Sequence, residues 1–411
     1  MSTPDQSSKG NPRALALGTA AFGVCFIAWA LLGPLGPDLQ EQLGLSDTQL
    51  SLTVAVPVLL GSLMRVPLGA MTDRYGGRIV FTALLSFVPL PLVGLALFND
   101  SWTAVLIFGF LLGFAGASFA IGIPFVNKWY PPSRQGFALG IYGMSMGGTV
   151  IAGLTAPKIA DATSIDVVFW ITAGLVAAMA ATFAIMARDA PRVDARPAGS
   201  MFAGLRAFRG SGAARAWALT LFYFMVFGGF VAMFLYLPKL LVGVHDLTKP
   251  DAGARAAGFA LLAVIARPIG GWLSDRIGAK TVLFASFLGT GGLALVLAAF
   301  YDQMVPLTIA CLTMAIFLGL GTGAVFKLVP EWYPDSVGAV TGVVGAAGGL
   351  GGFFPPLIMG VVKSETGSYA LGFILMAVVA AISLFVLLAI GRVGPGRKAG
   401  VDKRGRAMVA S

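Results

Sequence analysis

Apolar residues fill most of this chain in long stretches, and short polar or charged clusters separate one stretch from the next. Each stretch has roughly the 17–25 residues that cross a ~30 Å hydrocarbon core. Because lipid offers no hydrogen-bond partners to the backbone, such stretches form helices. The pattern therefore predicts an all-α membrane protein with about twelve transmembrane helices. They are expected at 14–36, 48–70, 79–98, 102–126, 136–158, 166–187, 216–242, 252–273, 281–300, 304–328, 338–362 and 369–391.

One long polar interruption, residues 188–215, divides these stretches into two equal sets. We expect two bundles of about six helices each, related by a pseudo-two-fold axis along the membrane normal. The predicted division is an N-terminal tail (1–13), a first bundle (14–187), a middle loop (188–215), a second bundle (216–391) and a basic tail (392–411).

The two halves repeat one motif at a constant offset along the chain. The first copy is Arg65-Val-Pro-Leu-Gly69-Ala-Met-Thr-Asp73-Arg74-Tyr-Gly76-Gly-Arg78. The second copy is Arg267-Pro-Ile-Gly-Gly271-Trp-Leu-Ser-Asp275-Arg276-Ile-Gly278-Ala-Lys280. Both halves run in the same direction through the membrane, so the repeat is parallel. Transporters built in this way hold the substrate near the midplane between the halves and rock around it.

The composition agrees with a membrane protein. The chain is 57% hydrophobic and only 11% charged, with a mean hydropathy of +0.86, whereas soluble proteins have roughly a quarter charged residues. The net charge is +10, which in a soluble domain would favour nucleic acid as a partner. Here the distribution of the basic residues indicates a different role.

If the N-terminus lies inside, most Lys and Arg residues fall on the cytoplasmic side, in the middle loop and the C-terminal tail. The basic residues on the outer side are Lys158, Lys239, Lys249, Arg255 and Lys363. This asymmetry predicts both termini in the cytoplasm and a multi-pass protein of the cytoplasmic (inner) membrane. The basic tail indicates contact with lipid headgroups and not with nucleic acid.

Several classes of function are excluded by residues that the chain lacks. Cys25 and Cys311 lie in apolar stretches and His245 is the only histidine, so we expect neither a metal site nor a cofactor. No phosphate-binding Gly-x-x-x-x-Gly-Lys-Ser/Thr loop is present, which excludes ATP hydrolysis by this motif. The loops are too short for a catalytic or output domain. We therefore predict a secondary transporter that is not an enzyme, and we expect a monomer.

Arg65 and Arg267 lie deep in two apolar stretches. Arg65 precedes Asp73 by eight residues, so at ~1.5 Å per residue it lies ~12 Å deep in a ~30 Å core. A charge at such depth marks a functional site by default. Every Asp and Glu lies in a loop or near the end of a stretch, so the two guanidinium groups need either an external anion or backbone carbonyls. Their fork of donors suits a planar oxyanion; in the alternative, helix carbonyls satisfy the arginines, which only hold the halves together.

Over essentially its whole length the chain resembles the major facilitator superfamily. The loop Gly69-Ala-Met-Thr-Asp73-Arg74-Tyr-Gly76-Gly77-Arg78 is similar to the signature of that superfamily between helices two and three, and Asp275 and Arg276 lie in its second copy. The resemblance implies that this loop is a conformational gate. We expect Asp73 and Arg78 to pair at the cytoplasmic ends of the halves and to separate on opening.

Several further segments resemble the nitrate/nitrite porter family. They are Leu31-Leu-Gly-Pro-Leu-Gly-Pro37, Leu59-Leu-Gly-Ser-Leu-Met-Arg65, Gly136-Phe-Ala-Leu-Gly140-Ile-Tyr-Gly143 and Gly348-Gly-Leu-Gly-Gly-Phe353-Phe-Pro-Pro356. The resemblance implies that paired arginines clamp the anion, that aromatic side chains flatten the pocket, and that glycine-rich helices slide against their neighbours. The matching positions are Arg65, Arg267, Phe119, Tyr223, Phe227 and Phe326, with Gly143, Gly147 and Gly349 in the glycine-rich stretches.

Two positions leave the mechanism open. The family commonly has an Asn where this chain has Gly147, and Ser145 is the candidate that supplies a hydroxyl instead. Lys327 precedes Glu331 by four residues, a spacing that allows an ion pair on one helix face. Lys327 is therefore either part of an inner gate or a lysine whose long side chain extends to the membrane interface.

The sequence thus predicts a transporter of nitrate and/or nitrite that works by alternating access. No Asp, Glu or His lies at the midplane as a proton carrier, which favours nitrate/nitrite exchange over proton-coupled nitrate symport. A carrier of another small anion such as formate, oxalate or phosphate is an alternative, although a dianion would need more basic residues. A drug or sugar carrier is disfavoured because embedded acids and amides are few.

Overall fold

A computed structural model describes residues 10–191, 203–210, 212–366 and 369–392. These residues form helices and contain no strand. The first half contains α1 (Pro12–Ala30), α2 (Gly36–Leu43), α3 (Asp47–Tyr75), α4 (Gly77–Phe87), α5 (Pro89–Phe98), α6 (Trp102–Leu112), α7 (Ser118–Asn127), α8 (Gln135–Met144), α9 (Gly148–Ala162) and α10 (Ile165–Met186). The second half contains α11 (Ala213–Tyr223), α12 (Gly229–His245), α13 (Lys249–Ile277), α14 (Ala279–Phe300), α15 (Met304–Trp332), α16 (Val337–Thr366) and α17 (Ala370–Arg392).

Within the described residues, 11 helical segments are long and apolar enough to cross a membrane. Each overlaps one of the predicted stretches, so these predictions are confirmed at the level of the helices. The remaining stretch, 338–362, falls on α16, and the side chains of residues 352–366 lie outside the described part of the chain. Residues 192–202 and 211 of the predicted middle loop and most of both predicted tails also lie outside it.

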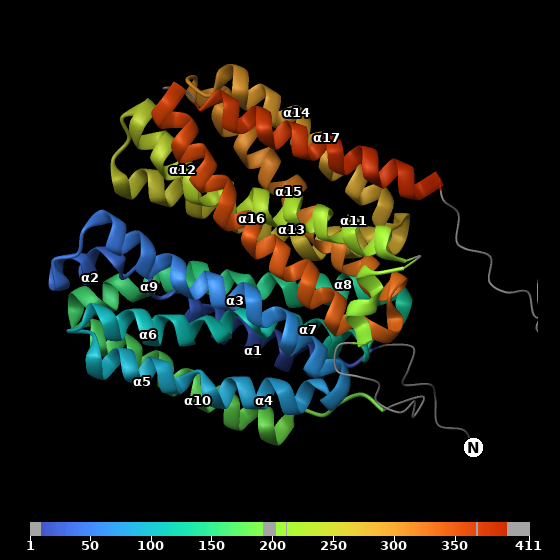
Figure 1. Ribbon diagram of the computed structural model, residues 1–411, viewed down its shortest axis with the longest axis horizontal. Coiled ribbons are helices and arrows are strands. Elements are labelled where there is room, and N and C mark those ends of the chain that lie inside the picture. The colour runs from blue at the N-terminus through green and yellow to red at the C-terminus, as the bar shows by residue number, and fades with distance from the viewer. Residues whose placement is uncertain (1–9, 192–202, 211, 367–368, 393–411) are drawn as a thin grey trace, which may run out of the picture.

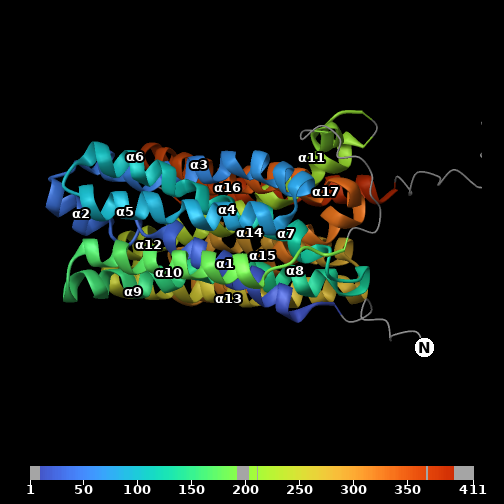
Figure 2. The same ribbon diagram turned by 90° about the horizontal axis from the view of Figure 1, so that it is seen from below.

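The two halves form two separate bundles that pack along one face. Figure 1 shows the first half (blue to green) below the second (yellow-green to red), with α3 and α8 facing α16 and α13 across the boundary. The helices of both halves run along one common direction, as the view in Figure 2 shows, which is the arrangement expected for spans of one bilayer.

The core lies between the helices, and large apolar side chains also cover the outside. Phe22, Phe81 and Phe259 are fully buried, whereas Ile185 and Phe385 are 80% and 72% exposed. This distribution is the one expected where lipid surrounds the helices. Cys25 and Cys311 are both buried and free, as predicted for small apolar side chains.

The predicted helix boundaries are wrong at the repeated motif. Asp73 was expected in a loop, but α3 continues through Tyr75. The helix ends because Gly76 adopts a φ of +92°, a conformation that costs little only for glycine. The second copy behaves identically, since α13 ends at Ile277 and Gly278 has a φ of +88°. A helix does not need to stop where the apolar residues stop, and both aspartates therefore lie in the last turn of a helix.

Three segments that cross the membrane carry an irregular turn partway along. A 3₁₀ turn, Gly113–Ala117, separates α6 from α7, and a second one, Ser145–Gly147, separates α8 from α9. A π turn, Phe224–Gly228, separates α11 from α12. Such turns free backbone groups and are tolerated at depth where they are buried in protein. All three turns contribute to the site described next.

Candidate binding site between the two halves

Arg65 on α3 is buried between the two halves. Its side chain is only 3% exposed. Its Nε donates a hydrogen bond of 3.2 Å to the carbonyl oxygen of Gly116, in the 3₁₀ turn before α7, and its Nη1 donates one of 2.5 Å to that of Gly345 on α16. The guanidinium carbon lies 5.7 Å from the ring centre of Phe119.

Arg267 occupies the equivalent place on α13 and is 2% exposed. Its Nη1 donates a hydrogen bond of 3.0 Å to the carbonyl oxygen of Gly143 on α8 and a further one to the thioether sulfur of Met146. The sulfur is a weak acceptor. Its Nε is buried and has no hydrogen-bond partner among the described residues. Arg267 is therefore less well satisfied than Arg65.

The two arginines are bound in a crossed, symmetrical way. Arg65 of the first half donates to Gly345 of the second, and Arg267 of the second half donates to Gly143 of the first. The glycines are related by the same offset as the arginines. Across the residues that the structure describes, neither guanidinium pairs with a carboxylate. The sequence left two possible partners for these arginines, an external anion or backbone carbonyls. In this conformation both arginines donate hydrogen bonds to backbone carbonyls.

The predicted aromatic residues gather beside the arginines. The rings of Phe119 and Tyr223 are stacked at 6.0 Å, although they come from different halves, and Tyr223 also stacks on Phe227 at 5.0 Å. Phe326 meets Phe119 and Tyr223 edge-on, at 4.6 Å in each case. The guanidinium of Arg267 lies 5.6 Å from the ring centre of Phe227. Tyr223 lies close enough to both guanidinium groups to interact electrostatically.

The glycine-rich helices combine close packing with contacts to the arginines. A Cβ on Gly271 of α13 would overlap the carbonyl oxygen of Gly136, and one on Gly69 of α3 would overlap that of Gly338. These glycines are needed because backbone meets backbone there. Nearer the site, a Cβ on Gly349 would lie 3.4 Å from Nη1 of Arg65.

Two residues of the fifth predicted stretch, Ser145 and Gly147, make contacts other than those expected. Ser145 was expected to offer its hydroxyl to the anion, but the hydroxyl donates to the carbonyl oxygen of Thr19 on α1 at 2.7 Å. A Cβ on Gly147 would contact Val264 of α13, so this glycine lies at the boundary between the halves. Gly147, which stands where the family commonly has Asn, therefore packs against α13. Ser145 does not offer its hydroxyl in place of the Asn amide.

The repeated aspartates join the halves at the end of the bundle near Gly76 and Gly278, which we call the loop end. The carboxylate of Asp73 accepts hydrogen bonds from the N–H groups of Gly338 and Ala339, at 3.0 and 2.9 Å. That of Asp275 accepts equivalent bonds from Gly136 and Phe137, at 3.0 and 2.8 Å. Each aspartate thereby caps the first turn of a helix of the other half, where a negative charge is favourable.

The basic residues of the gate have partners other than those expected. Arg78 was expected to pair with Asp73, but its backbone N–H and its Nη2 donate to Asp189 and Ala184 of its own half. Arg74 and Arg276 each lie over an aromatic ring of their own helix, at 5.3 Å from Tyr75 and 4.3 Å from Trp272.

Lys327 belongs to the loop-end contact. Its Nζ lies 2.7 Å from Oδ1 of Asp275 and donates a hydrogen bond to the carbonyl oxygen of Pro132 in the other half. Its partner is therefore Asp275 and not Glu331, which is exposed. Of the two readings of this lysine, the position favours a gate residue.

The backbone and thioether contacts of the site were not predicted from the sequence. Gly116, Gly345 and Met146 each bind an arginine, and Phe230 lies 5.8 Å from the guanidinium of Arg267. The repeat carried a usable signal for Gly345, since it stands at the arginine offset from Gly143. For Met146 no signal existed, because its equivalent in the second half is Gly348.

Comparisons with known proteins bear on the family and the fold of this chain. A family model described as Major Facilitator Superfamily matches residues 18–254 and 244–410. The probable nitrate/nitrite transporter NarK2 of Mycobacterium tuberculosis is 41% identical, over 91% of this chain and 95% of its own. The probable nitrate/nitrite antiporter NarK1 of Thermus thermophilus is 35% identical, over 92% of each. The crystal structure of the human organic anion transporter MFSD10 has a TM-score of 0.77 at 16% identity, covering 94% of this chain and 100% of its own.

Proposed function

Since the chain belongs to the major facilitator superfamily and, within it, to the nitrate/nitrite porter family, we propose that it moves nitrate and nitrite across the membrane by alternating access. The observation that carries this proposal is the pair of buried arginines. They approach from opposite halves, beside stacked aromatic rings and with no carboxylate partner in the described part of the chain.

A flat monoanion fits this chemistry. Guanidinium groups bind planar oxyanions through parallel N–H donors, and the rings of Phe119 and Tyr223 offer flat surfaces beside them. The unpaired Nε of Arg267 is a donor that an anion can satisfy. Leaving such a group buried without a partner costs about 1–3 kcal/mol, so an anion that accepts a hydrogen bond from this Nε removes that penalty.

The same hydrogen bonds link binding to movement. In this conformation the carbonyls of Gly345 and Gly143 accept bonds from arginines of the opposite half. An anion that binds the arginines competes with these carbonyls and weakens two of the bonds between the halves. The bonds of Asp73 and Asp275 then hold the loop end closed until the halves rock. Substrate binding thereby lowers the cost of the conformational change.

The membrane topology in this proposal includes α16 as a twelfth span. Its 30 residues exceed the roughly 20 needed to cross a bilayer. The distribution of Lys and Arg supports a cytoplasmic position of the loop end and of both termini, with the protein in the cytoplasmic membrane. One chain contains both arginines, so a monomer is sufficient for transport.

Exchange of nitrate for nitrite is the coupling mode that we propose. Two positive charges remain in the empty site, and like-charge repulsion disfavours the return of an empty carrier. The Thermus thermophilus relative is named a nitrate/nitrite antiporter, which supports this mode. Proton-coupled symport is the alternative.

Counterflow in proteoliposomes separates these modes. Vesicles loaded with nitrite receive external labelled nitrate, with and without an imposed pH gradient. Exchange predicts that internal nitrite stimulates uptake at equal internal and external pH. Uptake that needs an inward proton gradient, with no stimulation by nitrite, indicates symport, and absence of nitrate and nitrite transport in both conditions contradicts the proposal.

A further inference from the structure

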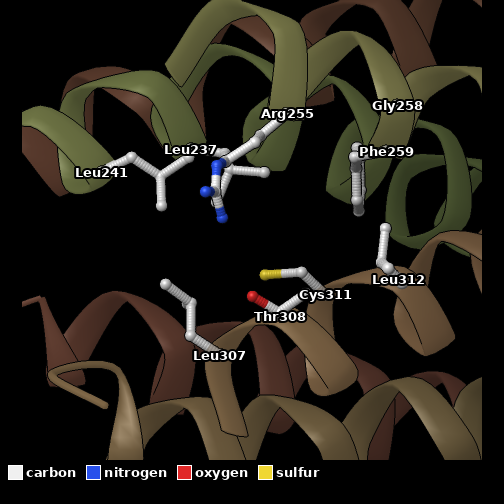
Figure 3. A pocket seen from close by; sticks show the side chains of 9 residues that line it. All are labelled: Leu237, Leu241, Arg255, Gly258, Phe259, Leu307, Thr308, Cys311 and Leu312. Atoms are coloured by element: carbon white, nitrogen blue, oxygen red, sulfur yellow. The ribbon is translucent and has the colours of Figure 1, made fainter. Parts of the chain in front are cut away.

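A cavity lies within the second half, away from the arginine site. Its volume is about 180 Å³, and α12, α13 and α15 supply its walls. Figure 3 shows the guanidinium of Arg255 pointing into the cavity from α13, while the hydroxyl of Thr308 and the thiol of Cys311 point into it from α15. The rest of the lining is apolar and includes Leu241 and Phe259.

Arg255 lies near the outer end of α13, and its side chain is exposed. It stands four residues inside the apolar span Asp251–Ile277, so at ~1.5 Å per residue it lies one turn below the end of the span, next to the layer of lipid headgroups. Its Nη1 donates to the sulfur of Met304 at 3.6 Å, which is a weak acceptor. Asp251, one turn earlier, accepts a hydrogen bond of 2.9 Å from the hydroxyl of Thr248.

The cavity is not part of the proposed transport route. All three of its helices belong to the second half, whereas the route runs between the halves. Along α13, Arg255 lies twelve residues before Arg267, which is ~18 Å at the helical rise. A small inorganic anion would leave the apolar walls uncovered. Leu312, which lines the cavity, is 38% exposed, and Arg255 is exposed as well, so the cavity opens to the surface of the second half.

We propose that this cavity binds one anionic phospholipid from the surrounding bilayer. The phosphate accepts hydrogen bonds from the guanidinium of Arg255, a pairing that suits the donor fork. The upper part of an acyl chain lies against Leu241, Phe259 and Leu312. Basic pockets between transmembrane helices bind anionic lipid headgroups on the cytoplasmic side, and the same guanidinium–phosphate pairing applies at the outer end, where Arg255 lies. The proposal rests only on the membrane location of the protein and is independent of the identity of the transported anion.

Two variants separate the contribution of the Arg255 charge to lipid binding from that of the apolar cavity volume. Arg255→Gln removes the cation and keeps the cavity. Gly258→Leu keeps the cation and fills the cavity, and it is tolerated because a Cβ on Gly258 has no neighbour within 4 Å. The control is Lys158→Gln, which removes an exposed cation from α9 of the other half. Each purified full-length variant is checked for a thermal unfolding midpoint equal to that of the parent protein.

Native mass spectrometry measures the retained lipid. The full-length protein in detergent is titrated with phosphatidylglycerol, and separately with phosphatidylcholine of the same acyl chains. We expect one phosphatidylglycerol to be retained in preference to phosphatidylcholine, with roughly tenfold or greater weakening in Arg255→Gln and no change in Lys158→Gln. Gly258→Leu should weaken the binding of both lipids. Equal retention of the two lipids by the parent protein, or unchanged phosphatidylglycerol binding in Arg255→Gln or Gly258→Leu, overturns the proposal.

Discussion

Lys327 and Asp275 form an ion pair of 2.7 Å at the point where α13 meets the first turn of α8. The same carboxylate caps that turn, and the same lysine also donates to Pro132 of the other half. The Trp-Tyr-Pro segment that begins five residues after Lys327 recurs in the first half at 129–131, which places Pro124 at the position equivalent to Lys327. The loop end is therefore closed by two similar caps, and one of them includes an ion pair that the repeat does not reproduce.

Breaking this pair should open the loop end. Asp275→Asn and Lys327→Met each leave one charge nearly buried, since the two side chains are 6% and 11% exposed, and an unpaired buried charge is costly. The double variant removes both charges, so its effect should be smaller than the sum of the single effects. The coupling free energy between substitutions of neighbouring groups is about 0.5–3 kcal/mol. This corresponds to roughly a 2- to 150-fold change in the equilibrium between the closed and the open loop end.

Spin labels report this equilibrium directly. Cysteines at Ile79 and Thr281, both exposed at the loop end, carry the labels in a background without Cys25 and Cys311, and electron paramagnetic resonance gives the distance distribution. Asp302→Asn, an exposed carboxylate between α14 and α15, is the control. Strictly additive effects of the two substitutions would show that the pair does not contribute to closure.

Gly271→Ala should also disfavour the closed loop end. A Cβ at this position overlaps the backbone carbonyl of Gly136, and backbone cannot move aside as a side chain can. Overpacking of this kind costs about 1–3 kcal/mol, so the closed state should lose roughly 5- to 150-fold in population. The same label pair measures the shift. Gly253→Ala on the same helix, where a Cβ meets nothing within 4 Å, should leave the distribution unchanged; equal behaviour of the two variants refutes the close-packing argument.

Met146→Leu should raise the apparent affinity for nitrate. The change keeps the side-chain volume but removes the sulfur that accepts a hydrogen bond from Arg267. The anion then no longer competes with the thioether, and KM should fall roughly 2- to 10-fold, as expected for the loss of one weak competing bond. Transport kinetics in proteoliposomes check this result. Met144→Leu, whose side chain is exposed, is the control, and a KM that rises in Met146→Leu would contradict the assignment.

The sequence predicted the helices and the paired arginines because both depend on strong, local signals. Long apolar segments form helices in lipid because few other structures satisfy their backbone hydrogen bonds there. A charged residue deep inside such a segment is easily recognised in the sequence. The repeat then related Arg65 to Arg267 without any structure. The structure brings the expected ring residues Phe119, Tyr223 and Phe326 together.

The partners of the charged groups could not be predicted in the same way. Asp73 and Asp275 bind backbone N–H groups of the opposite half, and backbone donors are identical at every position of a sequence. Lys327 pairs with Asp275 across two helices, whereas sequence spacing indicates only neighbours on one helix. The turn at Gly113–Ala117, which presents the carbonyl of Gly116, packs so closely against α3 that a Cβ on Gly113 would overlap the carbonyl oxygen of Pro57, and such a tertiary contact cannot be inferred from the sequence.

Two guanidinium forks bind one planar anion in the proposed mechanism, and nitrate uptake by lysine variants is the sharpest test of this binding mode. Arg65→Lys and Arg267→Lys each keep the positive charge but lose the parallel donors. In proteoliposomes preloaded with nitrite and matched for protein content, both variants should lose nitrate uptake by roughly 100-fold or more, as expected when charge-assisted hydrogen bonds are lost. Uptake at the rate of the parent protein in both lysine variants would show that the guanidinium groups of Arg65 and Arg267 do not bind the anion in this way.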